Sequence, residues 1–210
     1  MKITKYEHAC FTAEQDGDVL VVDPGELTTD FIVPENVVAI VITHEHPDHY
    51  DHNHIAAIID KNPDALIVGP VSVTDKITTL ETRSVSGGDS ITVGVFSLEF
   101  YGTMHEVIHP SVPPVENVGV LVNELVYYPG DSFTVPGKPV DTLALPVGAP
   151  WLRFREAGDF LHAIKPRFAF PTHDGVLSNT GRSFMDNWCH RFADSIDCEF
   201  KRIDGLSIEV

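Results

Sequence analysis

The sequence predicts an α+β fold in which two β-sheets pack face to face and helices cover their outer sides. Short strand-like runs recur along the whole chain, and helix-like segments enter after strands in both halves. The 15 glycines and 15 prolines fit the many tight turns that such a fold needs. No repeat, low-complexity tract or linker interrupts the 210 residues, so we expect residues 1–210 to form a single domain.

The first half of the chain alternates extended runs with turns and two helices. Gln15–Asp18 has the composition of a hairpin turn, and Asn62-Pro63 is typical of a helix end. Asp51 is a candidate N-cap for the first of the two helices. The expected strands are Lys2–Glu7, Phe11–Glu14, Val19–Val22, Val37–Ile42 and Leu66–Val68, and the expected helices are His54–Asp60 and Val73–Leu80.

The second half opens with a run of strands and then alternates strands with helices. The expected strands are Ser90–Val95, Phe96–Tyr101, Val118–Val122, Leu125–Tyr128, Thr142–Val147 and Phe168–Phe170. Helices are expected at Phe154–Ile164 and Ser183–Ala193. At the end, Glu199–Ile203 and Leu206–Val210 flank Asp204-Gly205, which predicts a closing hairpin.

Composition narrows the classes of partner and compartment. The 14 basic residues face 31 acidic ones, a formal charge of −17, which argues against nucleic acid because cations must neutralise phosphates. A small-molecule substrate, including an anionic one, stays open because a bound divalent metal inverts the local field. Cys10, Cys189 and Cys198 show no CxxC spacing, so we expect reduced thiols. No apolar run is long enough for a signal peptide or a membrane span, so we expect a cytoplasmic protein.

Histidines concentrate directly after the strand-like run that ends at Ile42. Five of the 11 histidines lie between His44 and His54. In extended backbone, His44 and His46 point to the same side, and Asp48 continues that parity before His49. Imidazole and carboxylate suit zinc, manganese or iron. Four donors in six residues exceed what one open tetrahedral ion uses, so two adjacent ions are expected, zinc first, with manganese or iron as alternatives.

Three further strand-like runs end in a potential metal ligand beside glycine or proline. Phe96–Tyr101 leads to His105, Leu125–Tyr128 leads to Asp131, and Phe168–Phe170 leads to His173. Glycine and proline let the backbone turn at such positions. Side chains fixed at strand ends by a rigid scaffold are suited to face a cleft. The sequence therefore predicts a metal site that collects donors from several strand ends.

The pattern His44-x-His46-x-Asp48-His49, followed by later His, Asp and His residues, resembles the metallo-β-lactamase superfamily of metal-dependent hydrolases. The resemblance implies a four-layer αββα sandwich with a dinuclear site at one edge. By the matching positions, His44, His46 and His105 hold one metal. Asp48, His49 and His173 hold the other, and Asp131 bridges both. It also implies that Asp23 supports a ligand histidine from outside the metal shell.

A branch of that superfamily fits best. The short chain resembles the group that includes ascorbate-phosphate lactonases and phospholipase D-type enzymes for N-acyl phosphatidylethanolamines. The segment Tyr6–Cys10 is similar to that group's His-Ser/Ala element, which implies that His8 lies near the metals. The segment after Pro24 lacks the usual Phe-Leu, and Glu106 stands where small residues are common. These departures leave the substrate open.

Some of the other histidines and one tryptophan are candidate pocket residues, and the rest are expected to be structural or exposed. His109 precedes a proline-rich loop that could cover the site, so His8 and His109 are the candidate pocket residues. His52 and His54 are expected to be exposed in a helix. Trp151 fits a pocket wall or an ordinary core position equally well. His162 and His190 fall in helices and are expected to be structural or exposed.

These residues predict a metal-dependent hydrolase in which a metal-bridging hydroxide cleaves a lactone, phosphodiester or acyl ester. Asp48 and Asp131 are the catalytic candidates. A Ser-His-Asp mechanism is disfavoured because Ser132 and Ser178 lack a Gly-x-Ser-x-Gly elbow. The alternatives are an iron-dependent oxidoreductase on the same fold, whose pattern has Glu in place of His46, and a non-catalytic metal-binding protein. A homo-oligomer is left open.

Overall fold

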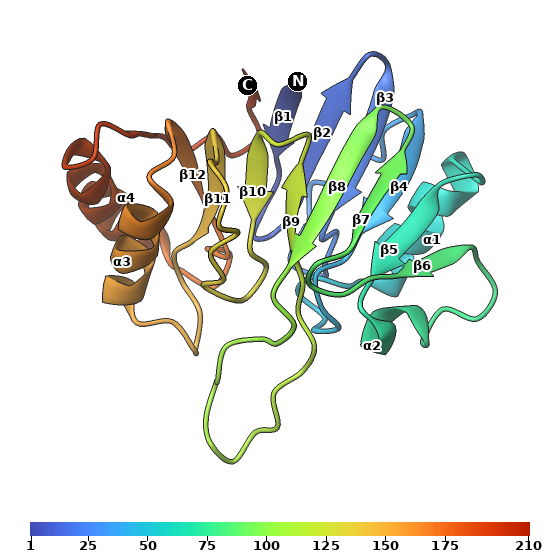
Figure 1. Cartoon of the computed structure of the whole chain (residues 1–210), viewed down its shortest axis with the longest axis horizontal. Helices are drawn as coiled ribbons and strands as arrows, with labels where there is room; N and C mark the ends of the chain where they lie inside the picture. The colour runs from blue at the N-terminus through green and yellow to red at the C-terminus, as the bar shows by residue number, and fades with distance from the viewer.

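A computed structural model describes all residues 1–210 and places its strands in two seven-stranded sheets (Figure 1). The first sheet has the order β14-β1-β2-β3-β4-β5-β6. Its strands are β1 (Lys2–Lys5), β2 (Phe11–Gln15), β3 (Asp18–Val22), β4 (Val37–Val41), β5 (Leu66–Gly69), β6 (Thr82–Ser84) and β14 (Ser207–Glu209). The hairpin between β2 and β3 forms as predicted, with Gln15 paired to Asp18. Asp16 and Gly17 both adopt positive φ in its turn.

The second sheet has the order β13-β12-β11-β10-β9-β8-β7. Its strands are β7 (Ser90–Val93), β8 (Phe96–Tyr101), β9 (Gly119–Val122), β10 (Val126–Tyr128), β11 (Thr142–Pro146), β12 (Phe168–Thr172) and β13 (Glu199–Phe200). Both sheets are mixed. Strands β3 to β6 are parallel neighbours, and so are β10 to β13, whereas the β7-β8-β9-β10 run is antiparallel.

Helices cover the outer faces, which gives the four-layer αββα sandwich expected from the sequence (Figure 1). They are α1 (His52–Lys61), α2 (Val71–Thr74), α3 (Phe154–Ile164) and α4 (Asn179–Asp194). Asp51 caps α1 as predicted, because its side chain accepts a hydrogen bond from the backbone N–H of Asn53. None of the four helices combines the length and the apolarity that a membrane crossing requires.

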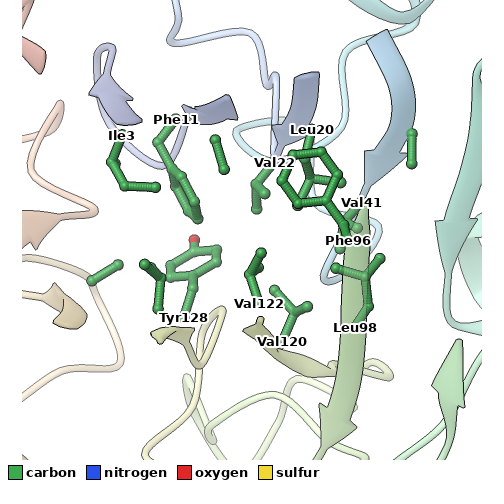
Figure 2. Packing of buried hydrophobic residues seen from close by; sticks show 14 of the residues in the cluster. Ile3, Phe11, Leu20, Val22, Val41, Phe96, Leu98, Val120, Val122 and Tyr128 are labelled. Atoms are coloured by element: carbon green, nitrogen blue, oxygen red, sulfur yellow. The ribbon is translucent and has the colours of Figure 1, made fainter. Parts of the chain in front are cut away.

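The buried apolar side chains form three hydrophobic clusters, because successive side chains of a strand point to opposite faces of its sheet. Leu20 and Val22 of β3 join the largest cluster, of 21 buried residues, which lies between the sheets (Figure 2). Val19 and Val21 face the other way and pack in a cluster that contains Ile55 of α1. The third cluster joins the second sheet to α3 and α4. Successive side chains of a strand point to opposite faces, so one strand serves two layers.

The predicted closing hairpin is wrong. Glu199–Phe200 forms β13, which pairs with β12 in the second sheet, whereas Ser207–Glu209 forms β14, which pairs with β1 in the first. The segment between them crosses from one sheet to the other and buries Ile203 in the central cluster. Two short strands joined by Asp-Gly fit a hairpin locally, but each gains more by extending an existing sheet edge.

The helix expected at Val73–Leu80 is also shorter than predicted. It begins at Val71 and ends at Thr74, and residues from Asp75 onward are turns and irregular backbone that lead to β6. The β-branched residues of this segment lower the cost of leaving the helix. The expectation of reduced thiols is confirmed, because Cys10, Cys189 and Cys198 are all free and buried.

Candidate metal centre

The predicted metal-binding side chains meet at one edge of the sandwich. His44, His46, Asp48 and His49 follow β4, and Asp131 follows β10. His105 follows β8 and His173 follows β12, both of which run in the same direction as β10. The carboxyl ends of strands from two facing sheets therefore supply all seven side chains to one place, as their positions after strands predicted.

Three groups of donor atoms form within this cluster, and the third joins Asp131 to His44 and His49. The ligand atoms of His44, His46 and His105 lie within 4.8 Å of one another, and so do those of His8, Asp48, His49 and His173. Asp131 lies between the groups. Its Oδ2 is 2.9 Å from His173 Nε2 and 3.2 Å from His105 Nε2, and its Oδ1 is 3.2 Å from His49 Nε2.

Three histidines have tautomers that are fixed by their outer hydrogen bonds. The Nδ1–H groups of His105 and His173 donate to the carbonyl oxygens of Glu106 and Gly148. His49 Nδ1 donates to Asp23 Oδ2 at 2.6 Å. In the neutral ring each Nε2 is then the lone-pair atom, and all three Nε2 atoms are buried without a hydrogen-bond partner, as is Asp131 Oδ1. Buried polar atoms without partners are costly, so four within one cluster fit bound cations.

His44 and His46 complete the donor set through a similar relay. Thr43 Oγ1 donates to Asp23 Oδ2 at 2.6 Å, so its oxygen accepts from His44 Nδ1 at 3.1 Å. His44 Nε2 is then an acceptor, and it lies 3.1 Å from His46 Nδ1. His46 Nδ1–H therefore donates to this acceptor, and a cation bound at His44 Nε2 would take the place of that hydrogen bond. Asp23 thus supports both His44 and His49, which agrees with the role implied for it.

Electrostatics in the cluster keep the carboxylates ionised. Burial alone would raise the pKa of Asp131, but the imidazoles of His173 and His49 hold that pKa well below its usual range. Burial opposes protonation of His173, yet Asp131 and Asp48 raise its pKa to about 9. Metal ligands must be deprotonated, so a divalent cation binding here displaces protons and takes over the pairing with the carboxylates.

His8 contacts the centre without offering it a lone pair. The backbone N–H of Gly175 donates to His8 Nδ1 at 3.0 Å, so Nε2 carries the proton and donates to Asp48 Oδ2 at 3.0 Å. Burial lowers the pKa of His8 to about 4, so the ring is neutral near pH 7. His8 therefore lies beside Asp48 as a hydrogen-bond donor that orients this carboxylate.

Backbone strain marks the same edge. Among the non-glycine residues with positive φ are His8, Asp23 and His173, with φ of 54°, 45° and 57°. The left-handed region costs such residues on the order of 1 kcal/mol each. Residues in such conformations cluster at sites where side chains must be aimed precisely.

Two contacts to Asp131 escaped the sequence analysis. Asn117 Oδ1 accepts the backbone N–H of Asp131 at 3.0 Å, and no local pattern marks that residue. Trp151, left between pocket and core, is buried and donates its indole N–H to Asp131 Oδ2 at 2.8 Å. The Gly148-Ala149-Pro150 turn before it was the available signal.

The remaining predicted histidines lie outside the cluster. His109 is exposed, and its contacts are with Ser111 in the loop between β8 and β9, which projects beyond the sheets in Figure 1. His52 is exposed in α1, and His54 is half-buried beside Asp51 at 3.1 Å. His162 and His190 are exposed on α3 and α4, as expected.

Two facing mixed sheets with a His/Asp centre at one edge define the metallo-β-lactamase fold class of metal-dependent hydrolases. The chain belongs to this superfamily, because the family model described as "Beta-lactamase superfamily domain" matches residues 2–173. It is 34% identical to Protein Rv0786c of Mycobacterium tuberculosis over 87% of this chain and 88% of that protein. It is 25% identical to a UPF0173 metal-dependent hydrolase of Carboxydothermus hydrogenoformans over 82% and 84%.

Solved structures share the fold over the whole chain. Igni18, a metallo hydrolase from Ignicoccus hospitalis, has a TM-score of 0.75 and 16% identity, covering 100% of this chain and 98% of its own. CmlA, a diiron β-hydroxylase from Streptomyces venezuelae, has a TM-score of 0.76 and 14% identity, covering 100% of this chain and 54% of its own. The fold alone therefore does not identify the reaction, which has to be inferred from the residues of the site.

Proposed function

We propose that this protein hydrolyses an ester-type bond of a small molecule with two divalent metal ions. The observation that carries the proposal is the gathering of buried, partnerless donor atoms from His49, His105, His173 and Asp131 in one cluster. A scaffold that had lost its metal site would gain stability by pairing or replacing these atoms.

The two donor groups suggest two metal positions. His44, His46 and His105 would hold one ion, and Asp48, His49 and His173 would hold the other. Asp131 would contact both, since its Oδ2 lies 3.2 Å from His105 Nε2 of the first group and its Oδ1 lies 3.2 Å from His49 Nε2 of the second. Imidazole and carboxylate donors suit zinc, with manganese and iron as alternatives.

Bound ions would lower the pKa of coordinated water toward about 7 and polarise the substrate oxygen. The chain's own residues do the positioning. His8 holds the Asp48 carboxylate through its Nε2–H, while Asp23 fixes the ring of His49. Asp48 and Asp131 are the residues proposed to orient the attacking water and to accept its proton, because both carboxylates lie within the donor cluster.

The loop between β8 and β9 is the proposed wall for the substrate's organic part. A narrow crevice beside His46 and His105 is lined by Ile108, Val112 and Val115 together with Pro113 and Pro114. Ile108 and Val112 are 38% and 44% exposed there, which suits contact with an apolar group rather than with water. Lactones, phosphodiesters and acyl esters remain the candidate bonds.

We also propose that the protein is cytoplasmic and that residues 1–210 form a single domain. All three cysteines are free and buried, which supports a reducing compartment such as the cytoplasm. Both sheets contribute side chains to one central hydrophobic cluster, which supports a single domain over residues 1–210.

Metal analysis coupled to a substrate panel tests the function. The panel pairs a lactone, a phosphodiester and an acyl ester with zinc-, manganese- and iron-loaded protein. Asp131→Ala and His46→Ala should lower turnover by on the order of 100-fold or more while the fold survives. His162→Ala, at an exposed helix position, is the control.

Undiminished turnover by metal-depleted Asp131→Ala would rule the mechanism out. Oxygen uptake by the iron-loaded protein without any hydrolysis would favour the oxidoreductase alternative instead.

A further inference from the structure

Trp151 is the one indole that contacts the metal centre. It lies between β11 and α3, is 8% exposed and donates its Nε1–H to Asp131 Oδ2 at 2.8 Å. Its ring centroid is 5.8 Å from that of His105 and 6.1 Å from that of His173. Phe133 packs against its other side at 5.4 Å. The indole is therefore wedged among side chains that fix its direction.

The hydrogen bond from Trp151 restrains the side-chain torsions of Asp131, whose main chain is already held by other contacts. Asn117 Oδ1 accepts the backbone N–H of Asp131, and the backbone N–H of Glu106 donates to the carbonyl oxygen of Asp131. The main chain is thus held on both sides. Rotation of a terminal carboxylate about χ2 is otherwise soft, so without another contact its two oxygens would exchange places.

The indole N–H also divides the carboxylate's lone pairs. An indole nitrogen donates and never accepts, so it occupies one lone pair of Oδ2 without competing for a cation. Oδ1, which faces His49, is buried with no hydrogen-bond partner and keeps both of its lone pairs. The contact makes the two carboxylate oxygens chemically different.

We propose that Trp151 is a positioning residue that fixes the Asp131 carboxylate so that its two oxygens serve the two metal positions at once. The proposal rests on the two-ion site described above. It goes beyond that site by naming Trp151 as the residue that controls how tightly the second ion binds. Loss of the indole N–H should weaken the second equivalent of metal more than the first, because only the shared carboxylate links the two positions.

Cobalt titration of purified, metal-stripped protein tests this role. The variants are Trp151→Phe, which keeps an aromatic ring but removes the N–H, and Trp188→Phe as the control. Trp188 is 38% exposed on α4, away from the cluster. Affinities come from competition with a chelator, stoichiometry from elemental analysis, and coordination from the visible spectrum of bound cobalt.

We expect Trp188→Phe to bind two equivalents as the wild-type protein does. Trp151→Phe should keep the first equivalent within about threefold and lose 10- to 100-fold in affinity for the second, as for other residues that orient a metal ligand. Its cobalt spectrum should change on the second addition only. In Trp188→Phe, the fluorescence of Trp151 alone should report loading.

Two results with Trp151→Phe would overturn the proposal. One is wild-type affinity and spectrum for both equivalents in Trp151→Phe. The other is parallel weakening of both equivalents together with a lower melting temperature of the metal-free variant, which would show a packing role only. A wild-type protein that binds one equivalent would also refute it. None of these readouts uses turnover, so an inactive but correctly loaded enzyme would count against the proposed function and not against this role.

Discussion

His8 carries hydrogen bonds whose directions determine what its ring does. Because Nδ1 accepts from Gly175, Nε2 must donate to Asp48, and a metal ion is not its partner. At the residue scale the centre is therefore a set of imidazoles with two kinds of task. Some present a lone pair inward, and His8 presents a proton to a carboxylate ligand.

Replacing His8 should weaken metal binding without emptying the site. His8→Ala leaves Asp48 free to rotate, and we expect a 10- to 100-fold loss of affinity at the position that Asp48 and His49 share. Chelator competition measures it. His190→Ala, an exposed helix histidine, should keep wild-type affinity. Equal affinities for the two variants would show that the contact does not orient Asp48.

Cys189 should make the folded state sensitive to alkali. Burial raises the pKa of its thiol to about 12 from an ordinary value of 9. Above pH 9 the unfolded chain releases this proton and the folded chain does not. The stability present below pH 9 is therefore lost as pH rises toward 12, by up to about 1.4 kcal/mol per pH unit.

Urea unfolding at pH 8, 9, 10 and 11 checks this slope. The free energy of unfolding of the wild type minus that of Cys189→Ala should fall as pH rises through this range. The substitution removes the thiol but leaves the other titrating groups, so common effects cancel in the difference. A difference that is constant with pH would contradict the assigned shift.

The loops that follow β3 and β4 pack so closely that one of them needs a glycine. A Cβ built on Gly25 would lie 1.9 Å from the carbonyl oxygen of Asp48 and 2.4 Å from the backbone nitrogen of His49. Backbone atoms cannot yield as a flexible side chain would. At the scale of elements, the turn after β3 therefore sets the position of the ligand loop after β4.

Gly25→Ala should therefore disturb the metal loop and the fold together. We expect a loss of about 1–3 kcal/mol in the free energy of unfolding, as for other overpacked sites, and weaker metal binding. Gly181→Ala is the matched control. Gly181 lies in α4, and the nearest atoms to a Cβ there, those of Leu177 and Ser178, are 3.5 Å away, so this variant should be neutral or more stable by about 0.5 kcal/mol. Denaturation with and without metal separates the two effects.

At the scale of the whole molecule, the proposed metal centre would tie the two sheets together. The first sheet supplies His44, His46, Asp48 and His49, and the second supplies His105, Asp131 and His173. The acidic excess of the chain, −17 overall, does not describe this edge. Two divalent cations would make the field there positive, which is compatible with a small anionic substrate.

Removing the metal should lower the melting temperature. A metal present at 100 times its dissociation constant stabilises the folded state by about 2.7 kcal/mol. For a chain of this size that corresponds to roughly 5–10 °C. Calorimetry with a chelator, and then with excess metal restored, measures the shift. His46→Ala should show a smaller shift, and an unchanged melting temperature in the wild type would contradict a metal shared between the sheets.

The sequence by itself predicted the layers and which side chains gather at one edge. Continuous apolar runs predicted inner strands such as β9, β11 and β12, because these strands bury both of their faces. The donors could be found because they follow strands directly, and the carboxyl ends of like-directed strands meet at one edge. Local periodicity and chain order were enough for both.

Only the tertiary structure decided the features that depend on distant partners. Glu199–Phe200 and Ser207–Glu209 went to different sheets because each found a free edge that no local signal reveals. Trp151 became a contact of Asp131 through a hydrogen bond across 20 residues. The physical reason is the same in both cases. The energies of strand pairing and of burial depend on segments that are far apart in the chain, so a local sequence pattern does not predict them.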